Sequence, residues 1–342
     1  MSNLGYKSCA TYMLPKGSVL LTSRAPIGNV AIAGRDMCTN QGFKSLISSE
    51  GSDGGYLYHC MRYFSQRLQA LGNGATFKEV SKKTVEDFEI PLPPLEEQKR
   101  IASILDKADG IRRKRKQAIQ LADEFLRSVF LDMFGDLLSK GWDWTTVEEL
   151  ADSAKDSMRT GPFGSDLKHS EFVDSGVAVL GIDNAVRNRF EWGKERFITI
   201  DKYEDLKRYT VRLGDVIITI MGTCGRCAVV PDDIPLAVNT KHLCCITLDK
   251  NKCLPEFLHS YFLMHPAANK YLGSRAKGAI MDGLNLGMIK ELPIPVVPIA
   301  LQIKYVGISK SVHKSLEKLN ISRIDQSGLF NALSQKAFSE KL

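Results

Sequence analysis

An internal repeat constrains the fold of this chain more than any other feature of its sequence. Gly17-Ser18-Val19-Leu20-Leu21-Thr22 matches Gly214-Asp215-Val216-Ile217-Ile218-Thr219, and Gly28 matches Gly225 at the same offset. Further matches follow in the same order: Asn40-Gln41 with Asn239-Thr240, Gly74-Ala75 with Gly278-Ala279, Pro91-Leu92-Pro93 with Pro293-Ile294-Pro295, and Gln98 with Gln302. The 342 residues therefore hold two copies of one unit.

Both copies predict the same order of elements. Apolar runs rich in branched residues, at 19–23 and 29–33 and again at 216–220 and 226–230, are typical of strands. Helical patches follow at 56–71 and 255–272, and then come a proline-rich elbow and a long helix. We therefore expect an α+β fold in which two β-rich domains are joined by two long helices.

The first long helix has the clearest pattern. Pro93-Pro94 precede it and Glu96-Glu97 lie in its first turn, so a helix is predicted over 95–134, about 60 Å long. Apolar and small residues at alternating spacings of three and four indicate a heptad seam. Aligning Gln98 with Gln302 transfers this register to the second helix and predicts an antiparallel coiled coil. The alternative is that each helix packs on its own domain. The predicted seam residues are Ile101, Ile104, Ala108, Ile111, Arg115, Ala118 and Phe125 with Tyr305, Ile308, Val312 and Leu319.

Composition and missing motifs exclude several classes of protein. Hydrophobic residues at 44% and charged residues at 25% are ordinary globular values. No run of 18 apolar residues and no signal-peptide pattern occurs, so we expect a cytoplasmic protein with reduced cysteines. The sequence contains neither a phosphate loop nor a HExxH motif, and its six histidines form no spaced cluster. Catalysis by this chain is not expected.

Four cysteines invite a zinc interpretation, which the sequence disfavours. Cys244 and Cys245 are adjacent, and neighbours on a strand face opposite ways. Cys224 and Cys227 align with the apolar Ile27 and Val30 of the first copy. We therefore expect small buried thiols and no metal.

Basic residues point to possible partners. The net charge of +7 permits a nucleic-acid partner without requiring one. Arg112, Arg113, Lys114 and Lys116 form a run on the first long helix, which is either a solvated face or a contact for phosphates or an acidic protein. Arg, Lys and Asn in Gly- and Ser-containing segments are what reading base edges needs, although each alone is more often a phosphate contact or plain surface. The candidate DNA contacts are Arg24, Lys44, Arg159, Ser165, Lys168, His169, Arg187, Arg189, Arg226, Asn239, Lys241, His242 and Lys277, and Lys194 and Arg196 lie among them.

Two groups of residues carry a family likeness. The elbow and helix start, Pro91-Leu92-Pro93-Pro94-Leu95-Glu96-Glu97-Gln98-Lys99-Arg100-Ile101, resembles the central spacer of type I restriction-modification specificity subunits. The segments 160–168, 214–219 and 239–242, with Gly222 and Gly225, are similar to the target recognition domain of those subunits.

The resemblance implies a non-catalytic subunit of a methyltransferase and endonuclease complex. Two target recognition domains would each read half of a split site in double-stranded DNA, and the coiled coil would fix the spacing. The helices would dock methyltransferase subunits, which use S-adenosylmethionine to methylate adenine, and a nuclease and translocase subunit can join. The implied domains are a partial first recognition domain (1–90), a spacer helix (91–141), a second recognition domain (142–292) and a C-terminal spacer helix (293–342).

The two copies differ before their Gly-Ser-Val and Gly-Asp-Val strands. The second copy has 71 residues there, from Asp143 to Leu213, whereas the first has 16. About 55 residues of the second copy thus have no counterpart in the first recognition domain. The shortfall is explained by an incomplete gene product, by a half supplied by a second chain, or by a domain that no longer reads DNA. Because such a domain leaves strand edges unpaired, we expect self-association or a partner at that edge. The alternative function is that of a coiled-coil interaction protein or half-subunit whose first domain has lost DNA reading.

Overall fold

The computed structural model describes residues 3–74, 78–135, 141–276 and 283–338. The side chains of residues 3, 165, 276, 319–327 and 329 are left out of the description. Within the described ranges, no helix combines the length and the apolar character that crossing a membrane requires.

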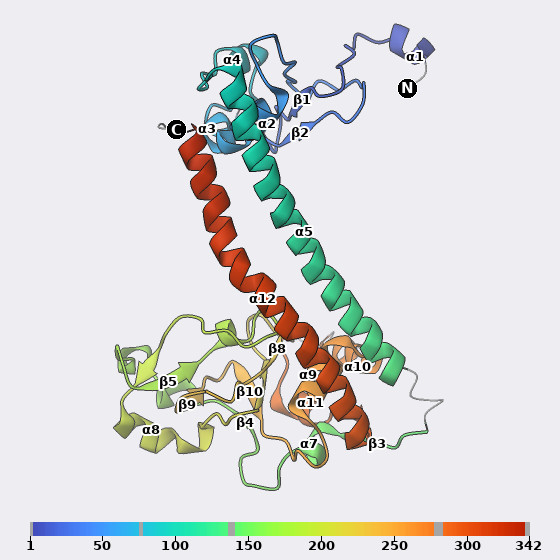
Figure 1. Ribbon diagram of the computed structural model, residues 1–342. Helices are drawn as coiled ribbons and strands as arrows, with labels where there is room; N and C mark the ends of the chain where they lie inside the picture. The colour runs from blue at the N-terminus through green and yellow to red at the C-terminus, as the bar shows by residue number, and fades with distance from the viewer. Residues whose placement is uncertain (1–2, 75–77, 136–140, 277–282, 339–342) are drawn as a thin grey trace. The chain divides into compact units, whose positions relative to one another are not determined.

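The chain packs as two compact units, and the fold is the expected mixture of helices and sheets. Unit 1 contains Met1–Gln120 and Leu316–Leu342, and unit 2 contains Leu121–Ser315 (Figure 1). Each unit holds one β-rich copy of the repeat together with a segment of each long helix. These helices are α5 (Leu95–Phe134) and α12 (Ile299–Phe338), and the bounds of α5 agree with the predicted ones.

Unit 1 is built around a small sheet covered by helices. Strand β1 pairs antiparallel with β2, and single bridges join Val19 to Leu46 and Thr22 to Phe43. Helix α2 starts after Asp53, whose side chain accepts a hydrogen bond from the Tyr56 N–H at 2.8 Å. The remaining elements of unit 1 are α1 (Asn3–Lys7), β1 (Val19–Leu21), β2 (Val30–Ile32), α2 (Gly54–Tyr63), α3 (Ser65–Ala70) and α4 (Lys82–Glu86).

Unit 2 contains three sheets, of which the largest is buried on both faces. Its strand order is β4-β10-β7-β8, and all neighbours are antiparallel. One face packs against α9 and α11, and the other against a sheet of order β6-β5-β9 in which β5 and β9 are parallel. The strands are β3 (Trp144–Thr146), β4 (Met158–Thr160), β5 (Val177–Leu180), β6 (Phe197–Ile198), β7 (Val216–Thr219), β8 (Cys227–Val229), β9 (Ala237–Asn239), β10 (Leu243–Ile246) and β11 (Pro293–Pro295).

Helices α9, α10 and α11 of unit 2 follow the last strand of its four-stranded sheet in the chain, and its other short helices lie between strands. They confirm the helical patch predicted for 255–272. The α-helices are α7 (Val147–Leu150), α8 (Ile200–Leu206), α9 (Pro255–Met264), α10 (Pro266–Ala276) and α11 (Leu286–Lys290), and the short 3-10 helices are η1 (Gly164–Asp166), η2 (His169–Glu171), η3 (Ile182–Asn184) and η4 (Lys207–Tyr209).

The repeat is reproduced bond for bond at the start of each long helix. The Gln98 amide accepts from the Asp53 N–H and donates to the carbonyls of Gly51 and Pro93, at 2.8–3.0 Å. In unit 2 the amide of Gln302 makes the same three bonds, at 2.8–3.1 Å, with the N–H of Leu254 and the carbonyls of Lys252 and Val297. A tyrosine also donates to the first proline carbonyl of each elbow, Tyr56 to Pro91 and Tyr261 to Pro293.

One match within the repeat is displaced by one residue. Thr22 and Thr219 are equivalent, and they pair with Phe43 and Leu243. Asn40 is therefore equivalent to Thr240 and not to Asn239. The identity of Asn40 with Asn239, the last residue of β9, pointed to an alignment one residue away from the strand register.

The two long helices are antiparallel. In unit 1 the first turns of α5 form a cluster with the last turns of α12, in which Ile101 and Leu105 meet Phe338. In unit 2 the end of α5 meets the start of α12, where the rings of Phe130 and Tyr305 lie 5.2 Å apart. The order of the contacts along the two helices is opposite, as expected.

The buried stripe of α5 differs from the predicted seam. Ile104, Ile111 and Phe125 are exposed, and Ala108, Arg115 and Ala118 are half-buried. A strict heptad drifts by about 20° per repeat relative to a straight α-helix, so the predicted positions leave the contact face. On α12, Tyr305 is buried, Ile308 and Val312 are half-buried, and the side chain of Leu319 lies outside the described residues. The buried positions of α5 are Gln98, Ile101, Ala102, Leu105 and Asp109 in unit 1 and Leu126, Phe130 and Phe134 in unit 2.

The charged residue in the buried stripe is Asp109, not Arg115. The Asp109 carboxylate forms ion pairs with Arg62, Arg112 and Arg113, the first at 3.5 Å. Burial would raise the pKa of Asp109, but the arginines hold that pKa below its usual value.

Of the four cysteines that invite a zinc interpretation, Cys227, Cys244 and Cys245 are buried thiols. Cys244 lies in the core shared with α9, and Cys245 lies in the core on the other face of the sheet, as the alternation of a strand requires. Burial raises the pKa of Cys244 to about 12 and that of Cys227 well above its ordinary value. Cys224 is half-buried. Within the described part of the chain, no group of three or more His, Cys, Asp or Glu side chains is placed to hold a metal ion.

Candidate nucleic-acid interface

Two segments of unit 2 that carry sequence motifs meet at one end of its sheets. Residues 161–168 follow β4, and residues 240–242 follow β9. A Cβ atom on Gly161 would lie 2.2 Å from the Asn239 carbonyl oxygen, far inside van der Waals contact. Only glycine allows this approach, so Gly161 lets the two segments pack directly against each other.

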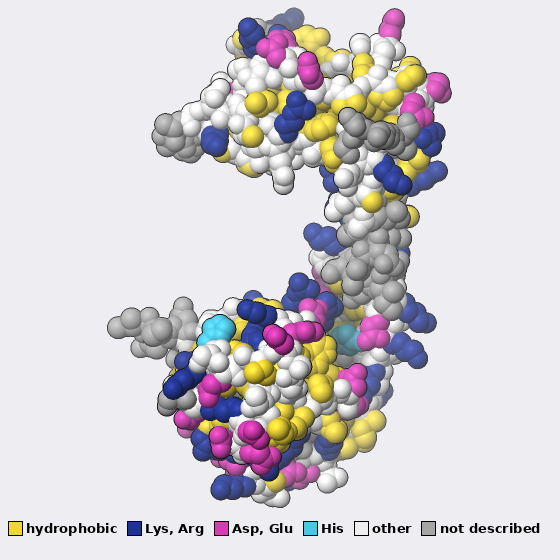
Figure 2. Space-filling model, turned by 90° about the vertical axis from the view of Figure 1, so that its left-hand side faces the viewer, with side chains coloured by type: hydrophobic (Ala, Val, Ile, Leu, Met, Phe, Trp, Pro, Cys, Tyr) yellow, Lys and Arg dark blue, Asp and Glu magenta, His cyan; other side chains and the backbone are white. Residues whose placement is uncertain are grey.

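Next to this junction lies a groove lined by apolar and charged side chains. It has a volume of about 510 Å³, and its lining includes His169, Lys194, Arg196, Thr240 and His242. A second groove of about 240 Å³ shares Lys194 and Arg196 and adds the exposed ring of Trp192. Figure 2 shows that Lys and Arg side chains on the visible surface of unit 2 are interspersed with Asp and Glu. The visible surface of unit 2 is therefore not uniformly basic. Lys194 and Arg196 lie together only at the two grooves.

Asp183 positions the basic loop of the groove. Its carboxylate accepts hydrogen bonds from Arg196 Nη2 at 2.7 Å and from the Lys194 N–H at 2.6 Å. A Cβ on Gly193 would lie 2.1 Å from Asp183 Oδ2, so the loop wraps tightly around the carboxylate. Burial would raise the pKa of Asp183, but the bonds from Arg196 and Lys194 keep that pKa below its usual value. Sequence reasoning missed Asp183, which lies in the 3-10 helix η3 shortly after β5.

Polar atoms without partners line the junction. The Oγ1 atom of Thr240 and the Oδ1 atom of Asn239 are buried, and neither has a hydrogen-bond partner among the described residues. Buried polar atoms are normally satisfied. Burial, and then the charges of Lys241 and Arg196, lower the pKa of His242, so this imidazole is neutral near pH 7 and can both donate and accept.

Most of the other candidate DNA contacts in unit 2 are accessible. Lys168, His169, Arg187, Arg189 and Arg226 are exposed, and Lys241 and His242 are half-buried. The arginines at 187 and 189 both pair with Glu191, which reduces their net charge. The side chain of Ser165 and all of Lys277 lie outside the described residues.

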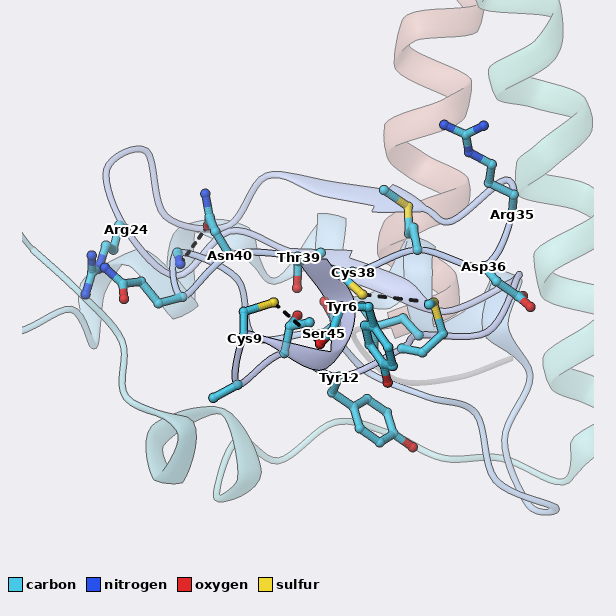
Figure 3. Close-up of a pocket in the computed structure, with 17 residues that line it drawn as sticks. Tyr6, Cys9, Tyr12, Arg24, Arg35, Asp36, Cys38, Thr39, Asn40 and Ser45 are labelled. Carbon is cyan, nitrogen blue, oxygen red and sulfur yellow. Dashed lines mark hydrogen bonds between the residues drawn. The ribbon is translucent and has the colours of Figure 1, made fainter. Parts of the chain in front are cut away.

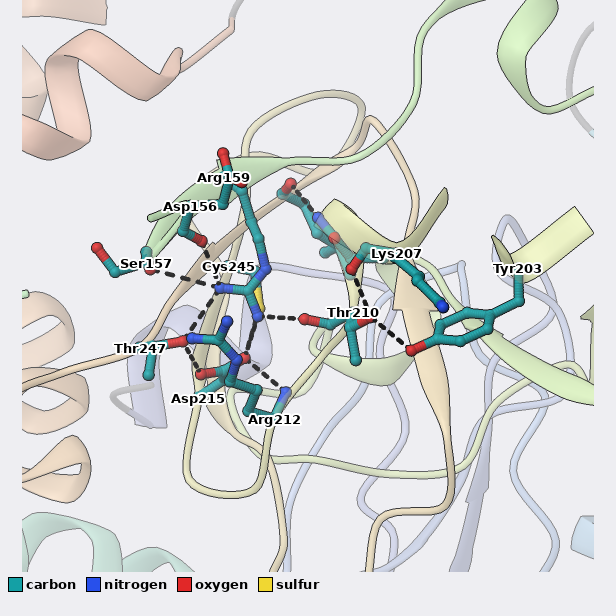
Figure 4. Close-up of polar contacts among 12 residues, drawn as sticks. Asp156, Ser157, Arg159, Tyr203, Lys207, Thr210, Arg212, Asp215, Cys245 and Thr247 are labelled. Carbon is teal, nitrogen blue, oxygen red and sulfur yellow. Dashed lines mark hydrogen bonds and ion pairs between the residues drawn. The ribbon is translucent and has the colours of Figure 1, made fainter. Parts of the chain in front are cut away.

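Arg159 and Asn239 are corrections, because both are buried. Arg159 is 5% exposed, and its guanidinium forms an ion pair with Asp215 and donates to Thr210 O and Thr247 Oγ1 (Figure 4). Asn239 has no exposed surface, and its Nδ2 donates to Leu243 O at 3.1 Å. Neither side chain can reach a base edge. Arg159 instead ties β4 to the central sheet.

Unit 1 offers little free positive charge at its candidate residues. Arg24 Nε lies 3.0 Å from Glu79, and Lys44 Nζ lies 3.7 Å from the same carboxylate. The basic run on α5 is also partly engaged: Arg112 and Arg113 pair with Asp109, and Arg112 lies over the Phe330 ring at 5.1 Å. Lys114 and Lys116 are exposed.

Comparison with protein families places this geometry in a known context. Residues 1–121 and 140–326 match the family model described as type I restriction modification DNA specificity domain. The MjaIX specificity subunit of Methanocaldococcus jannaschii is 38% identical over 132 residues, which is 38% of this chain and 31% of that protein. The Escherichia coli EcoBI specificity subunit is 24% identical over 323 residues, covering 84% of this chain and 65% of that protein. The matches thus span less than two thirds of these relatives.

A solved structure supports the fold. The crystal structure of a type I restriction-modification S subunit from M. genitalium superimposes with a TM-score of 0.65 at 17% identity, covering 97% of this chain and 85% of that one. A second structure, from a study of complex assembly and conformational transition of the type I system, has a TM-score of 0.52 at 18% identity.

Proposed function

Because the chain belongs to the type I restriction modification DNA specificity domain family, we propose that it is the DNA-recognition and scaffolding subunit of a type I restriction-modification complex. The observation that carries the proposal is the groove in unit 2 where the motif loops meet. It combines Lys194 and Arg196 with the half-buried imidazole of His242. Cations position a protein on phosphates, whereas small polar groups read base edges.

The scaffolding part of the proposal concerns α5 and α12. Two recognition units joined by two antiparallel helices suit a bipartite site in double-stranded DNA, because both halves then bind well only at one spacing. Methyltransferase subunits would dock on the helices near Lys114 and Lys116, and a nuclease and translocase subunit could join them. S-adenosylmethionine would be bound by the methyltransferase subunits and not by this chain, which we propose is non-catalytic and cytoplasmic.

The sequence read by the complex is tested by mapping adenine methylation. The chain is co-expressed with the methyltransferase subunit of a type I system from the same host, and methylated adenines are located in the host genome. We expect one split motif with a fixed gap. Methylation at an uninterrupted motif, or none above the level of the methyltransferase alone, would contradict the proposal.

The groove is tested by the salt dependence of binding to the mapped duplex. Lys194→Ala and Lys241→Ala should each weaken binding and reduce the slope of log K against log salt by about 0.9 if one phosphate contact is lost. Lys252→Ala, an exposed lysine of unit 2 outside the groove, is the matched control and should leave the slope unchanged. Equal slopes for all three variants would place DNA elsewhere.

A second candidate function has one observation in its favour. The candidate cations of unit 1, Arg24 and Lys44, are both paired with Glu79. This favours a chain whose first unit contributes helix contacts but no DNA reading. In that case the methylation map would show a half-site instead of a split one.

A further inference from the structure

A short loop of unit 2 holds two exposed arginines on one carboxylate. The loop, residues 185–191, directly follows the 3-10 helix η3. Glu191 Oε1 accepts a hydrogen bond from Arg189 Nε at 2.5 Å and also contacts Arg189 Nη2. Glu191 Oε2 lies 3.1 Å from Arg187 Nη1. Each oxygen of the carboxylate thus holds one arginine, and more than half of each arginine side chain remains exposed.

The backbone of Glu191 is fixed by the buried residue Asn184. The Asn184 carbonyl accepts from the Glu191 N–H at 3.3 Å, and Asn184 Nδ2 donates to the Glu191 carbonyl at 3.0 Å. Asn184 Oδ1 also accepts from the Gly181 N–H at 2.8 Å. Asn184 lines the smaller groove together with Trp192 and Lys194. The arginine loop therefore borders the region that we propose binds DNA.

The middle of the loop is fixed by Asn188. Its φ of +58° is a left-handed conformation that asparagine adopts more readily than most residues. Its carbonyl accepts from His259 Nε2 at 2.8 Å, and its Oδ1 accepts from the Cys227 N–H at 3.3 Å. His259 belongs to α9 and Cys227 to β8, so the loop is tied to two elements of the unit 2 core. A loop fixed in this way loses little conformational entropy on binding.

This arrangement suits the reading of a base better than the binding of a phosphate. A phosphate contact depends on net positive charge, which Glu191 reduces beside both arginines. A base contact depends on a guanidinium held in one orientation. Arg189 turns Nε and one N–H of Nη2 towards Glu191, and its two N–H groups on the Nη1–Nη2 edge lie outside this contact. Two parallel N–H groups of this kind pair with O6 and N7 of guanine.

The arginines beside a hollow in unit 1 are arranged differently. The hollow has a volume of about 1270 Å³, and Figure 3 shows Arg24 and Arg35 at opposite ends of it. Arg24 shares the Glu79 carboxylate with Lys44, whose ammonium group is a point charge without parallel donors. The two-arginine arrangement of residues 185–191 is therefore not repeated at this hollow.

We propose that Arg189 reads a guanine in the half-site recognised by unit 2. Glu191 and Asn188 are positioning residues, because Glu191 orients the guanidinium and Asn188 fixes the loop that carries it. Arg187 holds the second carboxylate oxygen. The inference rests on the proposed DNA recognition and adds the base that is read.

Methylation mapping with the co-expressed methyltransferase subunit tests the role of Arg189. One half of the wild-type motif should require a guanine at one position, and Arg189→Ala should methylate sites with other bases there. The other half should be unchanged. Lys207→Ala, which removes another exposed cation paired with a glutamate, is the control and should leave the whole motif unchanged.

Binding of the complex to duplexes with the mapped motif tests the contact directly. Replacing the guanine by 7-deazaguanine removes the N7 acceptor and should weaken wild-type binding about tenfold, with no such loss in Arg189→Ala. Asn188→Gly keeps the left-handed conformation but removes the Oδ1 acceptor, so it should reduce the ratio of the two affinities. It should leave the slope of log K against log salt unchanged, because no phosphate contact is lost.

Glu191→Gln separates base reading from phosphate binding by the sign of its effect. If Arg189 reads guanine, loss of the carboxylate should weaken binding to the guanine duplex and reduce the 7-deazaguanine ratio. Tighter binding with an unchanged ratio would show a phosphate contact and overturn the inference, as would an Arg189→Ala map identical to that of the wild type. A wild-type complex without preference for the mapped duplex over a scrambled one would instead refute the proposed function, and this inference with it.

Discussion

The two units carry the same scaffold with different additions. Both have the glutamine that ties a long helix to its elbow and the tyrosine that holds the first elbow proline. Unit 2 contains the residues 143–213, whose strand β4 is tied to the sheet by the buried Arg159–Asp215 ion pair. In unit 1 the position of Asp215 is taken by Ser18. The shared scaffold and the fastening of this block are thus two levels of the fold. The predictions below separate these two levels.

The largest expected effect is at the buried ion pair. Asp215→Ala leaves Arg159 charged and buried, which should lower the free energy of unfolding of unit 2 by about 3–5 kcal/mol. All three tryptophans of the chain, Trp142, Trp144 and Trp192, belong to unit 2, so tryptophan fluorescence in a urea titration reports this unit alone.

Two variants serve as references for Asp215→Ala. Ser18→Ala, at the equivalent position of unit 1, should not change the tryptophan-detected transition. The double variant Arg159→Met, Asp215→Leu should recover part of the loss, because no unpaired charge remains. A loss below about 1 kcal/mol for the single variant would show that water solvates Arg159.

The next effect compares the glutamines directly. Gln98→Leu and Gln302→Leu each remove three hydrogen bonds and leave a buried N–H and two carbonyls unpaired, which should cost about 2–4 kcal/mol in each unit. Hydrogen exchange of the first turns of α2 and α9 measures the two losses separately. A loss confined to one unit would show that the repeat is no longer equivalent in energy.

The smallest effect is a pH dependence of unit 2. Burial is the main cause that lowers the pKa of His259 below 6.5, although its ring nitrogen lies near two carbonyl oxygens. Because the folded state favours the neutral ring, this contribution to stability is complete above pH 6.5. It is lost as the pH falls through the folded pKa.

We expect the free energy of unfolding of unit 2, measured by urea titration, to fall between pH 7 and 5 by about 1 kcal/mol for each pKa unit of the shift. Burial also lowers the pKa of His265 and of His242, so His259→Gln should reduce the pH dependence and not abolish it. An unchanged slope in His259→Gln would assign the effect to these two histidines. Burial also lowers the pKa of His59 in unit 1. Because unit 1 contains no tryptophan, His59 does not contribute to this fluorescence signal.

The repeat made the scaffold predictable from sequence. Glycines, prolines and glutamines recur because turns, elbows and hydrogen bonds require those side chains, so Gln98 and Gln302 could be matched before any contact was known. The bounds of α5 followed from Pro94 and the acidic first turn. The contact face of α5 did not, because a 3.5-residue and a 3.6-residue period agree for only a few turns.

The candidate site was less predictable. Arg159 lies on a strand of three residues, where alternation shows two faces but not whether both are covered. The groups that bind its side chain, Thr210, Asp215 and Thr247, come from distant residues. Asn239 is the last residue of the three-residue strand β9, and a strand this short is hard to tell from a loop in the sequence. Asp183 carries no motif, and its role emerges only when Lys194 and Arg196 fold back onto it.

The Arg159–Asp215 pair also sets a compatibility rule for exchanging recognition blocks between scaffolds. A block that brings an arginine in its β4 strand needs an aspartate at the scaffold position of Asp215, and a block without that arginine leaves the aspartate unpaired. A chimera that places residues 143–213 on the first copy should therefore require Ser18→Asp, together with Ile47→Thr. Recombination between related chains would be filtered by these two scaffold positions before any DNA is read.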